Sequence, residues 1–128
     1  MSEEKKELLY SYMKSNVCPI LIKVPDNFVF PNSVYLPASC EKEELVGYYK
    51  KNAYFPPKWL SPLFDATKIL VIDKIDSITK EEQLKFKELL KAKKISTFGL
   101  PKDTVIIVTY NNLNINEEIY GLMAHIKD

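Results

Sequence analysis

Two uninterrupted apolar runs constrain the fold of this chain more than any other feature. One runs from Lys68 to Asp73 (KILVID) and the other from Thr104 to Tyr110 (TVIIVTY). A strand with water on one face alternates apolar and polar residues, so a continuous β-branched run predicts a strand that is covered on both faces. Such strands are typical of parallel sheets between layers of helices. The sequence therefore predicts an α/β fold.

The remaining pattern completes a layered domain over residues 1–128. Further short strands are predicted at Cys18–Val24 and Ser33–Leu36. Helices are predicted at about 3–14, within 38–52, at 59–64, from Ile78 to about Lys91, and at the end of the chain, where Ile119, Leu122, Met123 and Ile126 form an apolar stripe. We expect a single three-layer α/β domain with a mainly parallel sheet of about four strands flanked by helices.

The composition excludes several classes of function. All 18 basic residues are lysine, so the chain provides no bidentate arginine fork and no arginine finger. The three glycines are Gly47, Gly99 and Gly121, which leaves the first third of the chain without a glycine-rich phosphate loop. A net charge of +1 excludes a strongly basic nucleic-acid binder.

The location of the protein is predicted from its cysteines and its apolar runs. Cys18 and Cys40 have no metal-binding or redox spacing, and we interpret them as free, reduced thiols. The N-terminal segment is charged throughout, unlike a secretory signal. No apolar run approaches the ~20 residues that a membrane-spanning helix needs. We therefore expect a cytoplasmic protein without membrane contact.

Polar residues follow both of the continuous apolar runs. Asp73 and Asp76 come at the end of the first run, and Asn111 follows the second. The carboxyl edge of a parallel sheet is where α/β proteins bind ligands. A carboxylate there can hold a hydrated Mg²⁺ on a nucleotide phosphate, and an amide can orient a water or a phosphate.

With these motifs in place, the sequence from Ser33 to Ile126 resembles AAA+ ATPases of the MoxR-type branch. Each matching piece is short, and their order and spacing carry the resemblance. Ser33–Leu36 resembles the family's second strand, Leu45-Val46-Gly47 resembles the Val-Gly step that follows it, and Ser61–Phe64 resembles a Gly-Pro-Leu-Phe segment. Lys68–Asp76 resembles the Walker B strand, and Glu81–Lys91 resembles the helix after it. Val105–Asn111 resembles the strand that ends in the sensor-1 residue, and Asn116–Ile126 resembles the helix that follows.

The departures from this family are as informative as the matches. Lys74 stands where an active member has the glutamate that polarises the attacking water, and it could replace the Mg²⁺ charge or pair with Asp73 or Asp76. The segment Pro25–Asn32 after the first strand contains no glycine and no Gly-Lys-Ser/Thr. The sequence contains no arginine for a finger, and we expect no lid domain. The resemblance thus implies relic positions at Asp73, Lys74, Asp76 and Asn111, with no ATPase activity, cofactor or metal.

We accordingly predict a non-catalytic AAA+-like domain that acts as a protein-interaction or regulatory module. The expected partner is another protein, such as an AAA+ ATPase or a component of the same assembly. The residues predicted for the interaction surface are Tyr48, Tyr49, Tyr54, Leu84, Lys87 and Lys91. Because strands that end in Val-Ile-Asp occur in many α/β proteins, an unrelated small α/β fold stays open.

Two further classes of function compete with this prediction. A metal-dependent phosphoesterase or nuclease would use Asp73, Asp76 and Asp26, but Lys74 opposes a cation there. The only histidine, His125, is interpreted as a residue of the last helical turn.

Nucleic-acid binding is the other class. It would use the lysines of one helix and the aromatic residues near Lys50 and Lys51. The near-neutral net charge makes this class less favoured, and a solvated helix face with tyrosines partly in the core explains the same residues. The residues concerned are Tyr48, Tyr49, Tyr54, Phe55, Lys85, Lys87, Lys91, Lys93 and Lys94.

Overall fold

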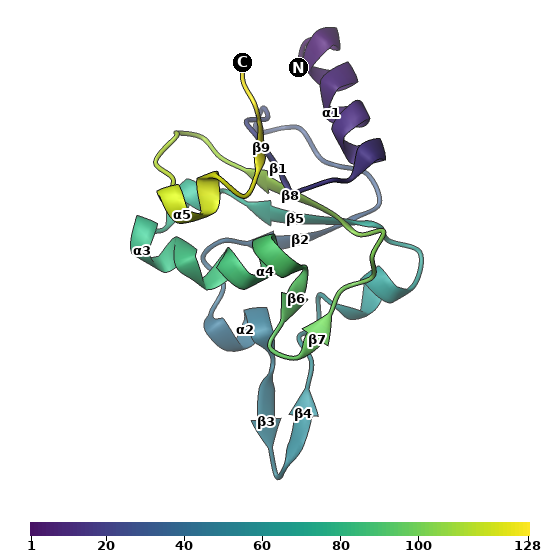
Figure 1. The fold of residues 1–128 in the computed structure, drawn as a ribbon, viewed down its shortest axis with the longest axis vertical. Coiled ribbons are helices and arrows are strands. Elements are labelled where there is room, and N and C mark those ends of the chain that lie inside the picture. Colours follow the sequence, from purple (N-terminus) through teal and green to yellow (C-terminus); the bar gives the residue numbers. More distant parts are fainter.

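The computed structural model describes residues 1–128 and contains a five-stranded sheet whose neighbouring strands are all parallel (Figure 1). Across the sheet the order is β2-β5-β8-β1-β9. The bounds are Ile20–Ile22 (β1), Ser33–Pro37 (β2), Ile69–Asp73 (β5), Val105–Thr109 (β8) and Ala124–Ile126 (β9). The predicted α/β class and parallel sheet are confirmed, with a fifth strand beyond the four expected.

The continuous apolar runs form the inner strands β5 and β8. Leu70 and Ile72 of β5 pack into the core on one face of the sheet, whereas Val71 between them packs on the other. All five residues of β8 are buried. This two-sided burial is the reason why the runs show no alternation of apolar and polar residues.

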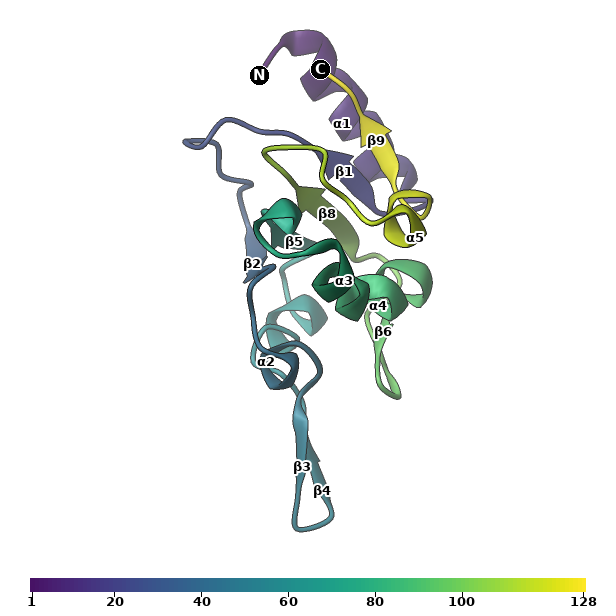
Figure 2. The ribbon, with the colours of Figure 1, turned by 90° about the vertical axis from the view of Figure 1, so that its left-hand side faces the viewer.

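One face of the sheet is covered by α1 (Glu3–Ser15) and by the loop 23–32. Ser2 caps the helix by accepting a hydrogen bond from the Lys5 amide. Leu9 is buried against the sheet, and Phe30 of the loop packs into the same apolar cluster. α1, which precedes β1, covers the part of this face that the loop does not cover (Figure 2).

The opposite face is covered by a series of short helices, and it holds the larger apolar cluster. Phe86, Leu89 and Leu90 are buried there, as their spacing predicts. Thr79 begins the central helical segment with a capping box to Glu82, a pattern that the spacing Thr79-x-x-Glu82 favours. The elements are α2 (Lys42–Val46), η1 (Ser61–Phe64), η2 (Ile75–Ser77), α3 (Lys80–Gln83), η3 (Leu84–Phe86), α4 (Lys87–Ala92) and α5 (Glu117–Tyr120), where η denotes a 3-10 helix.

The helix predicted within residues 38–52 is wrong beyond Val46. There the chain forms an antiparallel hairpin of β3 (Tyr48–Lys50) and β4 (Ala53–Phe55). Gly47 ends α2 with φ 80° and ψ −168°, a conformation found almost only in glycine. Lys51 and Asn52 both have positive φ, as a two-residue type I′ hairpin turn requires.

The predicted last helix is also wrong in its second half. α5 ends at Tyr120, and the chain then forms β9 beside β1, with Ile126 opposite Ile22. Hydrogen bonding to the sheet therefore outweighs the helical spacing of the apolar residues. Between α4 and β8, where Gly99 and Pro101 favour a loop, the chain also contains a small hairpin of β6 (Lys94–Ile95) and β7 (Phe98–Gly99).

The β3–β4 hairpin projects from the body at the end opposite α1 (Figures 1 and 2). The β6–β7 hairpin lies beside its base (Figure 1). Cys18 and Cys40 are both free thiols. None of the helices combines the length and the apolar composition that crossing a bilayer requires.

Candidate functional site

Asp73, Lys74, Asp76 and Asn111 lie at the carboxyl edge of the sheet, where their positions after the two apolar runs predict them. Asp73 is the last residue of β5, Lys74 follows it, and Asp76 lies in η2. Asn111 follows the end of β8, the strand next to β5. The sheet thus brings together two segments that are far apart in the sequence. The hydrogen bond between Lys74 and Thr109, for example, joins residues that are 35 positions apart.

Asp73 is engaged by the neighbouring strand. The Thr109 hydroxyl donates a hydrogen bond of 2.8 Å to Asp73 Oδ1 and accepts one of 2.9 Å from the Lys74 amide. Lys74 has a left-handed backbone with φ 58°, and its side chain is exposed. It forms no ion pair, so the predicted pairing with Asp73 or Asp76 is wrong.

Asp76 ties η2 to the loop after β8. Its Oδ1 accepts a hydrogen bond of 2.9 Å from the Asn111 amide, and its Oδ2 accepts one of 2.9 Å from the Asn112 amide. The exposed residue Asn111 therefore contributes its backbone to this contact. Both oxygens of the carboxylate are used to hold the loop, and the two amides are no longer free for an anion.

The loop after β1 closes over the core. The Phe28 amide donates to the Pro25 carbonyl at 2.9 Å, and the Phe30 amide donates to the Tyr35 hydroxyl at 2.9 Å. The Phe28 and Phe30 rings pack edge to face, and Phe30 is buried. A phosphate loop instead directs successive backbone amides at its ligand and leads into a helix. Neither feature is present between β1 and β2.

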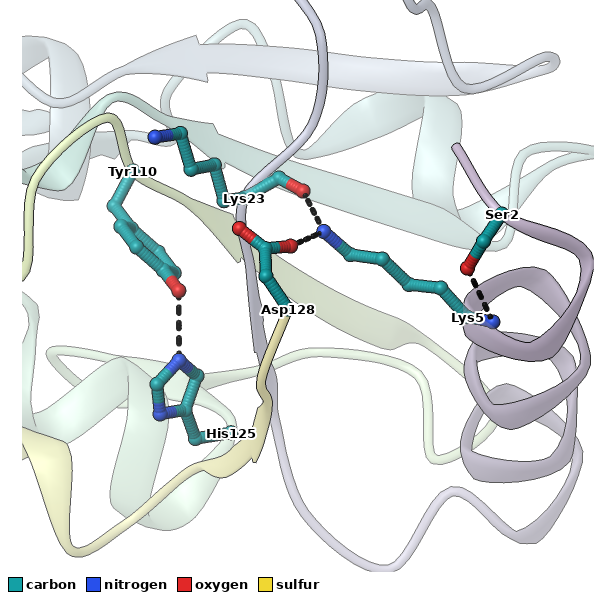
Figure 3. A network of polar contacts seen from close by, with 6 residues as sticks. All are labelled: Ser2, Lys5, Lys23, Tyr110, His125 and Asp128. Carbon is teal, nitrogen blue, oxygen red and sulfur yellow. Dashed lines mark hydrogen bonds and ion pairs between the residues drawn. The ribbon is translucent and has the colours of Figure 1, made fainter.

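His125 lies in β9 and not in a last helical turn, which corrects the sequence-based prediction. Tyr110 Oη is 2.7 Å from its Nε2 and Tyr120 Oη is 2.8 Å from its Nδ1 (Figure 3 shows the Tyr110 contact). Burial, and then the nearby charge of Lys127, lower the pKa of His125. A neutral imidazole has one donor and one acceptor nitrogen, so the two tyrosines take opposite hydrogen-bonding roles.

The N- and C-terminal segments meet beside His125 and its tyrosine partners. Lys5 Nζ donates to an Asp128 carboxylate oxygen and, at 2.6 Å, to the Lys23 carbonyl (Figure 3). The hydrogen bond from Lys5 is the main cause that lowers the pKa of Asp128. A neighbouring hollow of about 530 Å³ is lined in part by Lys23, Lys127 and Tyr110, which offer ammonium and hydroxyl groups.

No group of three or more His, Cys, Asp or Glu side chains is arranged to hold a metal ion. The alternative that combines Asp26 with Asp73 and Asp76 needs such a group, and the structure does not assemble it. Asp26 lies in the loop between β1 and β2. Asp73 instead accepts a hydrogen bond from Thr109 of β8, and Asp76 accepts one from the loop after β8. The edge therefore carries polar groups that mostly bond to one another.

The β3–β4 hairpin presents the opposite situation, with aromatic rings on both of its faces. Tyr48 and Phe55 stack on one face, with centroids 5.2 Å apart, and Tyr49 lies 5.0 Å from Tyr54 on the other. The Tyr54 hydroxyl donates to the Val46 carbonyl at 2.6 Å. This hydrogen bond fixes the hairpin to the body.

The base of the hairpin requires Gly47. A Cβ atom at this position would lie 2.3 Å from the Phe55 carbonyl oxygen, inside any permitted contact. The close approach of the two strands therefore leaves no room for a side chain. Gly47 is the sequence signal that could have revealed the hairpin.

The predicted interaction surface separates into two regions. Tyr48, Tyr49 and Tyr54 lie together on the hairpin, as just described. Leu84 is partly buried against the main core and is not fully exposed, and its part in an interaction surface stays a prediction. Lys87, on the helical face that also carries Lys91, forms a 3.0 Å ion pair with Glu118. The six residues therefore do not form one surface: the three tyrosines lie on the β3–β4 hairpin, and the two lysines lie on α4.

No protein-family model matches this chain, and a search of curated protein sequences finds no relative. Two regions therefore remain as the sources of functional evidence, the carboxyl edge of the sheet and the β3–β4 hairpin.

Proposed function

We propose that this chain is a non-catalytic AAA+-like domain that works by binding another protein. By rank along the chain, the strands lie in the order second, third, fourth, first, fifth. This order places β5 and β8 side by side. Asp73 and Asn111 follow the neighbouring strands β5 and β8, where that family carries its Walker B and sensor-1 residues.

The observation that carries the non-catalytic part is the engagement of the carboxyl edge. Phosphoryl transfer needs amides and cations directed at the phosphates and a group that orients the attacking water. Here Asp76 holds the amides after β8, Thr109 bonds to Asp73, and Phe30 packs into the core where a phosphate loop would lie. This arrangement supports a structural role for the relic residues.

The protein-binding part rests on a groove beside an edge strand. The groove has a volume of about 610 Å³ and lies between β2, α2 and the Tyr48–Phe55 face of the hairpin. β2 pairs only with β5, so the backbone groups along its outer side are free to pair with another strand. We propose that an extended segment of a partner protein pairs with β2 and packs on Tyr35, Tyr48 and Phe55.

The class of partner follows from the resemblance. An AAA+-like domain without its own phosphate loop fits as a subunit or regulator of an assembly that contains an active AAA+ ATPase. The free thiols Cys18 and Cys40 agree with a reducing compartment, and we propose the cytoplasm as its location.

Isothermal titration with ATP and Mg²⁺ tests the non-catalytic part. The wild-type chain and Asp73→Asn are both expected to give no binding heat. Micromolar affinity that depends on Asp73 would overturn the proposal, because it would show a working nucleotide site.

Affinity capture from the native cell, read by mass spectrometry, tests the protein-binding part. A true partner is expected to be captured by wild-type protein and by the control Tyr10→Ala, whose residue is 62% exposed on α1. The double variant Tyr48→Ala/Phe55→Ala is expected to lose the same partner. Equal capture by all three proteins would contradict the assignment of the groove.

A further inference from the structure

A row of four aromatic rings crosses the other face of the hairpin. It runs from Phe64 of η1 to Phe98 of β7, then to Tyr54 of β4 and Tyr49 of β3. The successive centroid distances are 6.3, 6.0 and 5.0 Å. Three separate segments of the chain thus contribute to one continuous aromatic surface.

The row is open to solvent and yet fixed in place. Tyr49 is 66% exposed, Phe64 is 55% exposed and Phe98 is 37% exposed. Tyr54 is partly buried and is held by its hydrogen bond to the Val46 carbonyl. Soluble proteins rarely leave several aromatic rings exposed side by side unless they bind something.

Unpaired lysines lie at the same end of the molecule as the row. Lys51 lies in the hairpin turn, whereas Lys50 alternates onto the Tyr48–Phe55 face and Lys58 lines the groove on that face. Residues 45–64 contain Lys50, Lys51 and Lys58 and no aspartate or glutamate. All three lysines are exposed, and none forms an ion pair. Positive charge at this end of the molecule therefore has no internal partner.

A lysine-lined hollow adjoins the base of the row. It has a volume of about 300 Å³ and is lined by Lys42, Lys85 and Lys94, with Glu88 as its only acid. Val46 and Ile95 also line it, and these residues contact the row through the Tyr54 hydroxyl bond and the pairing of Ile95 with Phe98. Charge and aromatic surface are thus continuous.

The net charge of the whole chain is near neutral, although positive charge is concentrated in residues 45–64. Residues outside 45–64 carry fifteen lysines against seventeen acids, so the rest of the chain is slightly acidic. The net charge therefore argues against a polyanionic ligand that covers the whole molecule. It does not argue against one at the hairpin end, where the local charge is positive.

We infer that the aromatic row Tyr49–Tyr54–Phe98–Phe64 binds single-stranded nucleic acid. Bases of a single strand can stack on exposed rings without regard to sequence, and lysines attract the phosphates between them. In a duplex the bases are already stacked on one another, so they are not available to stack on the aromatic rings. The cores of protein interfaces are depleted in lysine, so this row differs from a protein-docking surface.

The two faces of the hairpin then have different ligands. The Tyr48–Phe55 face belongs to the groove of the proposed protein partner, where Glu43 and Glu44 also lie. The Tyr49–Tyr54 face belongs to the nucleic acid. Nucleic-acid binding does not depend on the proposed function, and either can fail alone.

Fluorescence anisotropy with labelled oligo-dT and oligo-U of about twenty nucleotides tests the inference. Both single strands are expected to bind at low salt, and a duplex of equal length is expected to bind at least tenfold more weakly. The ratio of the DNA and RNA affinities tells which strand is preferred, and preference for either supports the inference. No binding of either strand at about 100 μM protein would overturn it.

Variants separate stacking from simple charge attraction. Tyr49→Ala is expected to weaken binding by about fivefold to a hundredfold, the range that loss of one stacked base implies. Tyr49→Phe keeps the ring and is expected to bind as the wild type does. The control Tyr10→Ala removes an equally exposed tyrosine far from the row and is expected to have no effect.

The salt dependence tests the lysines. Lys50→Gln/Lys51→Gln is expected to make the slope of log K against log salt shallower by about 0.7 for each phosphate that these lysines neutralise. A labelled poly-glutamate peptide serves as the alternative polyanion. If it binds as tightly as oligo-dT and Tyr49→Ala leaves both affinities unchanged, the surface is an unspecific cation patch and the inference is wrong.

Discussion

The carboxyl edge of the sheet and the β3–β4 hairpin differ in how their polar and aromatic groups are partnered. At the edge, Asp73 and Asp76 both accept hydrogen bonds from other parts of the chain. On the hairpin, Tyr49 and the lysines of the turn have no polar partner within the molecule. The first region is closed on itself and the second is open.

A position that matches a catalytic motif therefore need not be a position that is available for binding. The residues that attract attention in the sequence, Asp73 and Asp76, stabilise the fold. The residues that face solvent are aromatic and come from segments whose structure the sequence does not reveal directly. We therefore expect mutations at the edge to change stability and mutations on the hairpin to change binding.

The largest effect is expected from Gly47→Ala. The added Cβ would collide with the Phe55 carbonyl at a backbone conformation that only glycine adopts readily. We expect a loss of about 3 kcal/mol of unfolding free energy, combining backbone strain with overpacking. Urea unfolding measures it.

Gly99→Ala is the matched control for this substitution. A Cβ atom at Gly99 would meet no heavy atom within 4 Å, so its effect should stay within about 0.5 kcal/mol. Equal stability of both variants would show that the hairpin base is not closely packed.

Asp76→Ala should have the next largest effect. It removes a carboxylate from the amides of Asn111 and Asn112, and we expect a loss of about 2 kcal/mol. The same urea experiment measures it, with Asp65→Ala as a control because Asp65 is exposed and has no side-chain hydrogen bond or ion pair in the structure. Unchanged stability in Asp76→Ala would mean that the edge is not closed.

A smaller effect is expected from the titration of His125. Its pKa is lowered from 6.5 in the folded protein, chiefly by burial, so the unfolded chain binds the proton more readily. Stability should therefore be full above about pH 6.5 and should fall as the pH drops below that value, until folded His125 is also protonated. Thermal unfolding between pH 5 and 7 measures the slope.

His125→Gln should abolish that slope, because His125 is the only histidine. Asp128, whose pKa is lowered from 3.8, contributes only at lower pH, where its stabilisation is lost as it is protonated. A slope that persists in His125→Gln would assign the pH dependence to other groups.

Tyr49→Ala should have the smallest effect on stability. It removes one cross-strand ring pair, with Tyr54, and we expect a loss below about 1 kcal/mol. Urea unfolding of Tyr49→Ala beside Asp76→Ala gives the sharpest contrast between the two regions. A larger loss in Tyr49→Ala than in Asp76→Ala would reverse the comparison.

The sequence predicts the sheet well where local and tertiary preferences agree. The runs ending at Asp73 and Tyr110 are apolar throughout because the sheet buries both of their faces. The capping box at Thr79 likewise needs no tertiary information. The positions of Asp73 and Asn111 at one edge follow from parallel strands alone.

Prediction fails where tertiary contacts override the local pattern. Ile119, Leu122 and Ile126 have helical spacing, but Ile126 pairs with β1 and the helix ends at Tyr120. The β3–β4 turn uses Lys51 and Asn52 in place of the usual Asn-Gly signal, so only Gly47 marks it. The aromatic row joins three separate segments and cannot be predicted from any one of them.

The position of β1 has a consequence for the order of events during synthesis. β1 lies between β8 and β9, and Ile20 pairs with both Ile107 and Ala124. The strand leaves the ribosome before β8 and β9 and stays unpaired until both have followed. Pairing over such a separation is slow, and the exposed β-branched strand is prone to aggregate meanwhile. We expect the nascent chain to depend on α1, which folds locally, to shield this strand until its neighbours arrive.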